Sequence, residues 1–440
     1  MGHLHGIGGD SRRKLILSAA ITSAALSALF LVAYGGANWL AARSNHIGKW
    51  YFGWELGIPL VPAMIVPYMT IDLFFVAAPF LCRDRREMAT FAKRVAFEIV
   101  TAVTFFVTMP LTVAFPREPV DGVFGPVFAW FRGMDAPYNL FPSLHIALRT
   151  VLADLYARHT RGPYWLAVTV WFSLIGFSTV LTHQHQLVDI AGGFALAAVA
   201  IYLFREEPMQ RPVIPNPRVG VYYAVACAAT VGLAVAIWPW GAFLLPWALG
   251  LAMIVAGYLG IGPGVYRKEN GRLPRSAQCV LAPVLIGQWL SLRFYARRGR
   301  PWDEVTPGLW IGRVLNDREA AQAVTAGVAA VLDLTAEFSE AEPFRAVNYL
   351  NLPILDLTAP TAGQLHDAVD FINSAAPDGV TYIHCKIGYS RSAAVAAAFL
   401  LAQGQASSVD DALAQLRAVR PSIIIRAEAR EAVERFAAAR

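Results

Sequence analysis

The segment TYIHCKIGYSRSAA, residues 381–394, places a thiol and a guanidinium in one short loop. Five residues separate Cys385 from Arg391, and Gly388 lies between them. The apolar run before the loop predicts a strand, and the Ala-rich run after it predicts a helix that begins near Ser392. A strand, a loop and a helix N-terminus in this order can point several backbone N–H groups at one anion. We therefore expect the loop to bind a phosphate dianion, with Arg391 on its oxygens and Cys385 beneath the phosphorus.

The same loop activates its cysteine, because a helix N-terminus and a nearby cation favour the thiolate over the thiol. Cys385 is then the nucleophile of a phosphocysteine reaction, which also needs an acid for the leaving oxygen. Asp356, in the segment NLPILDLTAP after another predicted strand, is the acid that we predict. Asp333 and Asp367 also lie near predicted strand or helix ends, where most aspartates cap backbone N–H groups, and they remain alternatives.

A second group of reactive side chains lies in the apolar part of the chain, in the segments NLFPSLHIALR and STVLTHQHQLVDIAGG. His185 and Asp189 are four residues apart at the start of a predicted helix, so the carboxylate can orient the imidazole and stabilise its charge. His145 begins another predicted helix, in the first of the two segments. Two imidazoles and a carboxylate can transfer a phosphoryl group without a metal, since one imidazole attacks phosphorus and the other protonates the leaving alcohol. The alternative is that these groups only tie helices together through hydrogen bonds.

The composition indicates what kind of chain must position these residues. Of 440 residues, 56% are hydrophobic and 15% are charged, and the mean hydropathy is +0.46. These values exclude a single soluble globule and favour a membrane protein. Eight apolar segments are long enough to span a bilayer, namely residues 15–41, 58–81, 95–115, 138–157, 164–182, 187–204, 219–238 and 241–259.

The Lys and Arg residues outside these segments predict the orientation of the chain. They are concentrated in alternate connections, beginning with the N-terminal one, so both termini are expected on the cytoplasmic side and the membrane histidines on the outer side. A further apolar segment, residues 277–292, is short, contains Pro283 and is basic on both sides. We predict an interfacial helix there and keep a ninth span as the alternative.

Charge divides the chain into a basic part and an acidic part. Residues 301–440 contain 11 Lys and Arg against 17 Asp and Glu, a net charge of −6, which leaves +12 for the first 300 residues. A basic balance in a membrane part indicates juxtamembrane loops, and we expect no nucleic acid partner. The four cysteines have no spacing typical of disulfides or of a metal site, and only Cys385 lies in the acidic part.

Residues 384–392 match the pattern H-C-x-x-G-x-x-R-S, and the chain from about residue 301 to residue 440 resembles the dual-specificity branch of the protein tyrosine phosphatases. The resemblance implies a phosphomonoesterase with no metal or other cofactor, in which His384 belongs to the active-site loop and Ser392 eases departure of the thiolate. Lys386 adds positive charge of the kind found in lipid- and inositide-directed members. The expected substrate-binding residues of the loop are Lys386, Gly388 and Ser390.

The membrane segments resemble the type-2 phosphatidic-acid-phosphatase superfamily. The run PSLH, which ends at His145, is closest to the inositolphosphotransferase-like and sphingomyelin-synthase-like branch, because lipid phosphatases have P-S-G-H there. Ser178, His185 and Asp189 fit the last block of the superfamily, in which Thr179 here replaces an arginine. The resemblance implies that His185 is the nucleophile, Asp189 its partner and His145 the acid. The expected substrate contacts of this site are Arg117, Ser143 and Ser178.

Taken together, the sequence predicts a multi-pass α-helical membrane domain followed by a soluble α/β cysteine-phosphatase domain with a central sheet. The predicted divisions are a six-helix membrane domain (residues 1–206) and two additional transmembrane helices (207–262). A basic connector with the interfacial helix (263–300) and a cytoplasmic phosphatase domain (301–440) follow.

The predicted function is that of a bifunctional phosphatase of the inner membrane. Its cytoplasmic domain is expected to hydrolyse a phospholipid phosphomonoester, and its membrane domain to hydrolyse or transfer lipid phosphate on the outer side. The partners are then phospholipid phosphates and the membrane, because a tether raises the local concentration of membrane substrate. One alternative is a membrane-anchored protein tyrosine/serine phosphatase that acts on phosphoproteins and has a non-catalytic membrane module. Another is a membrane half that serves as a non-enzymatic, flippase-like or scaffold module.

Overall fold

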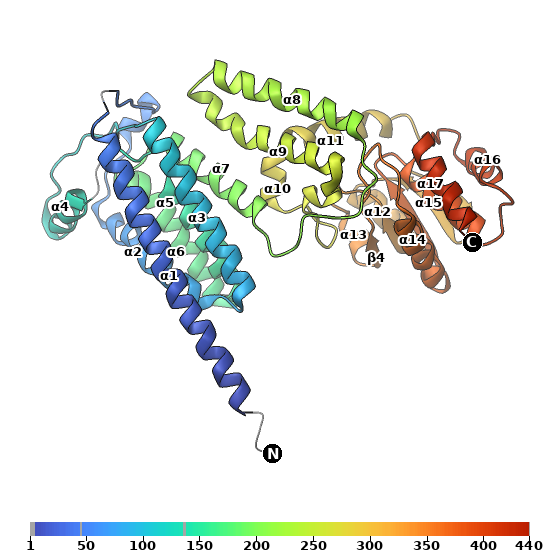
Figure 1. Ribbon diagram of the computed structural model, residues 1–440, viewed down its shortest axis with the longest axis horizontal. Coiled ribbons are helices and arrows are strands. Elements are labelled where there is room, and N and C mark those ends of the chain that lie inside the picture. Colours follow the sequence, from blue (N-terminus) through green and yellow to red (C-terminus); the bar gives the residue numbers. More distant parts are fainter. Residues whose placement is uncertain (1–4, 45, 135–137, 440) are drawn as a thin grey trace. The chain divides into compact units, whose positions relative to one another are not determined.

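The computed structural model describes residues 5–44, 46–134 and 138–439, and the chain forms two compact units that divide between Glu206 and Glu207 (Figure 1). The first unit consists of helices. Their bounds are α1 (His5–Ala41), α2 (Ile65–Ala77), α3 (Arg85–Thr108), α4 (Gly125–Met134), α5 (Leu144–Arg158), α6 (Gly162–Leu181) and α7 (Leu187–Leu203).

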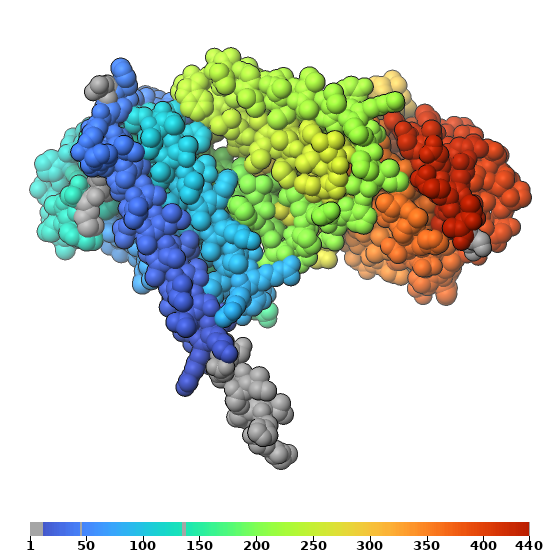
Figure 2. Space-filling model, in the orientation of Figure 1, coloured from blue at the N-terminus to red at the C-terminus, as the bar shows by residue number. Residues whose placement is uncertain are grey.

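The helices of the first unit pack around one apolar core. Helix α1 runs alongside α3, as its blue side chains beside the cyan ones show in Figure 2. Helix α5 packs against α3, α6 and α7, so it lies at the centre of the group. Its buried face includes Leu148, Val151, Leu152 and Leu155, which recur at the three- and four-residue spacing of one helix face.

Five helical segments in the described part of the chain are long and apolar enough to cross a membrane. They are Arg12–Ala41, Pro62–Leu81, Gly162–Leu181, Pro217–Ala236 and Trp240–Ile261. They coincide with the first, second, fifth, seventh and eighth spans that the sequence predicts. Helices also lie at the other three predicted positions, but α5 and α7 have only 15 and 17 residues and α3 carries charged side chains such as Arg94 and Glu98.

The second unit begins with a helical hairpin and continues into an α/β domain. The hairpin consists of α8 (Pro217–Ala236) and α9 (Leu245–Ala256), which continues into a further turn at Gly257–Ile261. Two shorter helices follow, α10 (Arg275–Val280) and α11 (Ala282–Ala296).

The α/β domain has one five-stranded sheet in the order β1-β2-β5-β3-β4. Strand β1 is antiparallel to β2, and the other pairs are parallel. The strands are β1 (Trp302–Thr306), β2 (Leu309–Arg313), β3 (Val328–Asp333), β4 (Asn348–Asn351) and β5 (Val380–Cys385). The helices are α12 (Asp317–Thr325), α13 (Glu342–Arg345), α14 (Ala362–Ala375), α15 (Arg391–Ala402), α16 (Val409–Val419) and α17 (Ala427–Ala438).

Alternation along the central strands distributes their side chains between two cores. In β5, Ile383 packs in the core with α14 to α17, whereas its neighbour Tyr382 packs in the core with α12 and α13. Leu332 and Val331 of β3 divide in the same way. A period of two is the geometry of a strand with apolar layers on both faces. The fold class predicted from the sequence, apolar helices followed by an α/β domain with a central sheet, is therefore confirmed.

Candidate active sites

The phosphate-binding loop predicted from the sequence joins the carboxyl end of a central strand to a helix N-terminus. Cys385 is the last residue of β5 and Arg391 is the first residue of α15. Gly388 has a φ of 74°, and a Cβ atom there would lie 2.5 Å from the carbonyl oxygen of Gly312 in β2. Only glycine accepts both conditions, so the tight path of the loop depends on this position.

The thiol of Cys385 is buried in this loop, with its Sγ 3.3 Å from Ser392 Oγ. Burial alone would raise its pKa. However, Arg391 and hydrogen bonds from Ser392 and from the backbone N–H of Gly388 act in the opposite direction, and their net effect is to lower the pKa of Cys385. The geometry therefore favours a thiolate in the position expected of a nucleophile.

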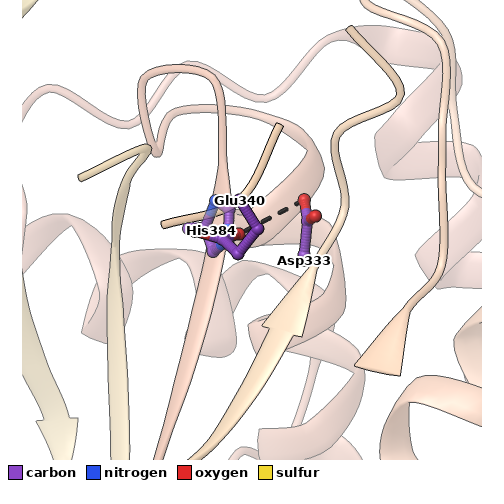
Figure 3. Close-up of side chains that lie close together, drawn as sticks. All are labelled: Asp333, Glu340 and His384. Carbon is purple, nitrogen blue, oxygen red and sulfur yellow. Dashed lines mark hydrogen bonds and ion pairs between the residues drawn. The ribbon is translucent and has the colours of Figure 1, made fainter. Parts of the chain in front are cut away.

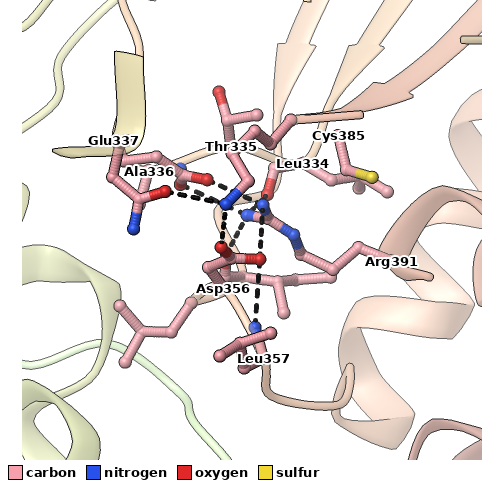
Figure 4. Close-up of polar contacts among 12 residues, drawn as sticks. Leu334, Thr335, Ala336, Glu337, Asp356, Leu357, Cys385 and Arg391 are labelled. Carbon is pink, nitrogen blue, oxygen red and sulfur yellow. Dashed lines mark hydrogen bonds and ion pairs between the residues drawn. The ribbon is translucent and has the colours of Figure 1, made fainter. Parts of the chain in front are cut away.

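The guanidinium of Arg391 is fixed by two acidic side chains, as Figure 4 shows. It donates to both carboxylate oxygens of Glu337, at 2.7 and 3.2 Å, to the carbonyl oxygen of Ile354 at 2.8 Å, and to Asp356 Oδ1 at 3.2 Å. A bidentate pair of this kind sets the plane of the guanidinium. Sequence reasoning missed Glu337, because nothing in its spacing relates it to a loop 54 residues away.

Asp356, the predicted acid, lies beside the loop in the segment after β4. Its Oδ2 is 2.5 Å from Lys386 Nζ, and its Oδ1 accepts from Arg391 and from the backbone N–H of Leu357. Burial alone would raise its pKa, but Arg391 and Lys386 outweigh burial and lower the pKa of Asp356. The structure thus brings the predicted nucleophile, cation and acid together at one edge of the sheet, where parallel strands end.

The remaining predicted loop residues differ in their surroundings. Lys386 is 9% exposed and also donates to Gln288 Oε1 of α11 at 2.9 Å. Ser390 precedes α15 and is half-buried, and its side chain makes no capping hydrogen bond to the helix. Ser392 is fully buried against the thiol.

His384 belongs to a buried ionic cluster with Asp333 and Glu340, and these three side chains offer ligand atoms close enough to hold a metal ion (Figure 3). His384 Nε2 lies 2.7 Å from Glu340 Oε2. Burial would lower the pKa of His384, but Glu340 and Asp333 raise it. The ammonium of Lys268 binds Asp333 and donates to Thr335, so a lysine and a histidine lie against the two carboxylates. The cluster is thus accounted for as an ion-pair network, and we assign no metal to it.

A second arginine supports the outer side of the loop. Arg420 donates to the carbonyl oxygens of Gly388 and Ile387, each at 3.2 Å, and it is paired with Asp303 Oδ2 at 2.7 Å. These contacts fix two consecutive carbonyls of the loop backbone. Arg420 directly follows α16, and sequence reasoning missed it.

In the membrane unit, the structure places His185 and Asp189 together at the start of α7. His185 Nδ1 lies 3.5 Å from Asp189 Oδ2, which also accepts from the backbone N–H of Gln186 at 2.9 Å. Both side chains are buried, Asp189 completely. The carboxylate is therefore fixed by the helix N-terminus and can orient the imidazole, as the four-residue spacing predicts.

Close packing of α5 on α7 positions the second histidine. The backbone N–H of Ser143 donates to the carbonyl oxygen of Asp189 at 3.0 Å, and a Cβ at Gly193 would lie 2.5 Å from the carbonyl oxygen of Ser143. Glycine thus allows the start of α5 to touch α7. His145, in the first turn of α5, stacks on Tyr68 with ring centroids 4.2 Å apart.

Two of the expected substrate contacts of the membrane site, Ser143 and Ser178, use their hydroxyls within their own helices. Ser143 accepts from the N–H of Ile146 and caps α5, while Ser178 donates to the carbonyl oxygen of Ile175 at 2.7 Å. Both hydroxyls are buried and used within helices. Thr179, at the position of the missing arginine, likewise donates to a backbone carbonyl of its own helix.

Arg117 is exposed, in the segment between α3 and α4. Two residues earlier, Phe115 stacks on the His183 ring with centroids 4.1 Å apart, so this segment lies beside the loop between α6 and α7 that carries His185.

Sequence reasoning missed a buried acid in the membrane unit, Glu55, whose Oε2 accepts from the N–H of Leu187 at 2.9 Å. Glu55 therefore caps α7 next to Asp189.

Comparison with known proteins identifies both parts of the chain. Residues 309–435 match the family model described as "Dual specificity phosphatase, catalytic domain", and residues 63–203 match the PAP2 superfamily. The chain is 29% identical over 144 residues to phosphatidylglycerophosphate phosphatase PTPMT2 of Arabidopsis thaliana, which covers 31% of this chain and 63% of that protein. It is 36% identical over 92 residues to mouse phosphatidylglycerophosphatase and protein-tyrosine phosphatase 1, over 20% of this chain and 47% of that protein.

The matched segments span less than two thirds of the length of these relatives. Among solved structures, the crystal structure of PTPMT1 in complex with PI(5)P aligns with 24% identity and a TM-score of 0.30, over 32% of this chain and 96% of that one. The chain therefore contains a PAP2-superfamily domain at residues 63–203 and a dual specificity phosphatase catalytic domain at residues 309–435.

Proposed function

We propose that the C-terminal domain hydrolyses the phosphomonoester of a phospholipid headgroup. The observation that carries this proposal is the link from the loop to α11. Lys386, next to the nucleophile, is hydrogen-bonded to Gln288, and the same helix exposes Ile286, Trp289 and Leu290. An apolar face of this kind fits the headgroup layer of a bilayer. If α11 lies in the headgroup layer, the phosphate of a lipid headgroup lies at the same level as the loop. The names of both relatives support a phosphatidylglycerophosphate as the substrate class.

The proposed chemistry follows from the loop. The Cys385 thiolate attacks phosphorus, the P–S bond forms, and the P–O bond to the headgroup breaks as Asp356 gives its proton to the leaving oxygen. Water then attacks the phosphocysteine and passes a proton to Asp356, and the P–S bond breaks. Ser392 stabilises the departing thiolate by hydrogen bonding. Arg391 and the loop N–H groups stabilise the charge on the phosphoryl oxygens in both steps.

Asp356 must be protonated when the leaving oxygen departs, although the free site favours its carboxylate. Two cations, Arg391 and Lys386, are responsible for this preference. A phosphate dianion that binds Arg391 and Lys386 adds negative charge beside Asp356 and reduces the effect of both cations, which raises the pKa of the acid. Substrate binding would therefore itself prepare the proton donor.

For the membrane domain we propose hydrolysis or transfer of lipid phosphate through a phosphohistidine at His185, with Asp189 as its orienting partner and His145 as the acid. The contact between the starts of α5 and α7 supports this assignment. The distribution of Lys and Arg supports an outward-facing site in the inner membrane, with the cysteine-phosphatase domain in the cytoplasm. The PSLH run supports the inositolphosphotransferase-like branch of the superfamily.

A second candidate is a membrane-anchored protein tyrosine/serine phosphatase with a non-catalytic membrane module. Thr179 favours it, because a short hydroxyl bonded within its own helix stands where the superfamily has a phosphate-binding arginine. The protein-tyrosine phosphatase named in the mouse relative supports the same candidate.

The test is phosphate release from a panel of phospholipid monoesters and phosphopeptides in detergent micelles, with wild type, Cys385→Ser and His185→Ala. Loss of a different lipid activity in each variant is the expected result. If Cys385→Ser abolishes only phosphopeptide turnover and His185→Ala changes nothing, the lipid assignment is wrong and the anchor candidate holds.

A further inference from the structure

The segment that carries Asp356 is held from outside the phosphatase domain. The phenol of Tyr258, in the turn after α9, donates to the backbone carbonyl of Asp356 at 2.8 Å. The side-chain amide of Asn216, immediately before α8, donates to the carbonyl of Leu357, also at 2.8 Å. The N–H of Asn216 in turn donates to the carbonyl of Tyr258 at 3.0 Å. Both ends of the α8–α9 hairpin thus bind two consecutive carbonyls beside the proposed acid.

Leu357 is in a backbone conformation that needs such support. Its φ is 60°, in the left-handed region that residues with a Cβ seldom adopt. Strained backbone of this kind persists only where the surroundings impose it, and it is concentrated at functional sites. Within the segment, the N–H of Leu357 donates to Asp356 Oδ1. That contact uses the carboxylate itself, so it weakens whenever the acid is protonated or turns to a leaving oxygen.

The two hairpin contacts do not depend on the state of the acid, because they bind backbone carbonyls. Tyr258 is 1% exposed and stacks on Tyr223 of α8 with ring centroids 5.6 Å apart, so its phenol has little freedom to move. On the other side of the acid, Gln288 of α11 binds the ammonium of Lys386, which pairs with Asp356. The backbone and the charge environment of the acid are therefore both set by helices outside the matched catalytic domain.

We propose that the α8–α9 hairpin is part of the phosphatase active site, and that Tyr258 and Asn216 are positioning residues for proton transfer by Asp356. This inference rests on the proposed phosphomonoesterase reaction, but not on the substrate being a lipid. A displaced acid loop leaves the thiolate and Arg391 intact, so attack on phosphorus continues while protonation of the leaving oxygen fails.

The test compares two soluble esters with the full-length protein in detergent micelles. p-Nitrophenyl phosphate has a good leaving group and needs little acid assistance, whereas glycerol phosphate has an alkoxide leaving group and needs the acid. Tyr258→Phe is expected to reduce kcat on glycerol phosphate at least about tenfold, with less than about a twofold effect on p-nitrophenyl phosphate. The decline of kcat with rising pH, which would report deprotonation of Asp356 in the substrate complex, is expected to flatten for glycerol phosphate in the same variant.

Asn216→Ser provides a second variant, because serine retains the ability to cap α8 but is too short to reach Leu357. Asp356→Asn shows how far kcat on glycerol phosphate falls when the acid is lost completely. Tyr222→Phe is the matched control, since Tyr222 lies on the same hairpin and is 73% exposed. Its kinetics are expected to equal those of wild type.

Equal losses on both esters, or no loss in either positioning variant, would overturn the proposal. Because both esters are soluble, the outcome is independent of the lipid panel above, and failure of the lipid assignment leaves this test unaffected.

Discussion

At the scale of single residues, Cys385 shows opposing influences on one thiol. Burial disfavours its charge, while Arg391 and the hydrogen bonds from Ser392 and Gly388 favour it, and the second group prevails. The lowered pKa gives Cys385 a larger thiolate fraction at neutral pH than an ordinary cysteine, whose pKa is about 8.5.

This balance predicts how the alkylation of Cys385 depends on pH. As the pH falls below about 8.5, an ordinary thiol loses thiolate by up to about tenfold per unit, whereas the reactivity of Cys385 with iodoacetamide is expected to decline only at lower pH. Ser392→Ala is expected to move the loss of reactivity to higher pH, because it removes one stabilising hydrogen bond. Mass spectrometry of the labelled peptide measures the rate.

The Cys385→Ser variant shows the background from Cys82, Cys227 and Cys279. A tenfold decline in wild-type labelling for each pH unit below 8.5 would contradict the assigned thiolate.

The sequence predicted the residues of the loop because they are neighbours in the chain. His384, Cys385, Gly388, Arg391 and Ser392 fall within nine positions, and the strand and helix around them fix their arrangement. Glu337, Arg420 and Asp303 come from other elements, so no spacing relates them to the loop. Their contacts with the loop depend on the order of the strands in the sheet and on the packing of the helices. Residue spacing in the sequence does not reveal either one.

At the scale of elements, the turn at Gly388 is the place where β5, β2 and the loop meet. Gly388→Ala combines a left-handed φ with a Cβ only 2.5 Å from the backbone of Gly312. Since this backbone cannot yield without moving β2, the loop must shift, and a displacement of about 1 Å at a catalytic site costs about a hundredfold in rate. We expect a loss of that order in phosphate release from p-nitrophenyl phosphate.

Gly404→Ala is the control for strain without collision. Gly404 has a φ of 67° with no atom within 4 Å of the added Cβ, and it lies after α15 away from the loop. This variant is expected to lose about 1–2 kcal/mol of unfolding free energy and to keep its kcat. Full activity in Gly388→Ala would show that the loop is less constrained than its contacts indicate.

Element prediction was strongest where apolar runs were long and weakest where polar residues shape a helix end. The eight apolar segments all contain helices, yet the run at residues 138–157 includes a cap at Ser143, so α5 itself begins only at Leu144. Hydropathy registers the run but not the cap. The packing of α5 on α7 through Gly193 is likewise a contact between distant segments, which composition cannot reveal.

At the scale of the whole molecule, the connector at residues 263–300 packs into the phosphatase domain through a buried ion pair. Lys268 has a side chain only 2% exposed and is paired with Asp333, beside His384. From sequence, this stretch was a basic connector, because one lysine among many basic residues gives no sign that it is buried.

Lys268→Met is therefore expected to destabilise the second unit. It leaves Asp333 without its ammonium partner, and breaking a buried ion pair on one side costs about 3–5 kcal/mol. Arg272→Met is the matched control, since Arg272 pairs with Glu342 on the surface, with side chains 62% and 65% exposed. Its effect is expected to stay below about 1 kcal/mol. Thermal unfolding in detergent, followed by tryptophan fluorescence, measures both. Equal midpoints for the two variants would contradict the assignment.

The exposed apolar face of α11, together with the two bilayer-length helices of the same unit, has a consequence for how rates are to be measured. An enzyme fixed at a surface encounters its lipid substrate in two dimensions, so the relevant quantity is the mole fraction of substrate in the surface and not its bulk molarity. Inert detergent added at constant total substrate then slows turnover by surface dilution, while hydrolysis of a soluble ester stays unchanged. One preparation of the protein would thus obey two different concentration laws, according to whether its substrate is confined to the interface.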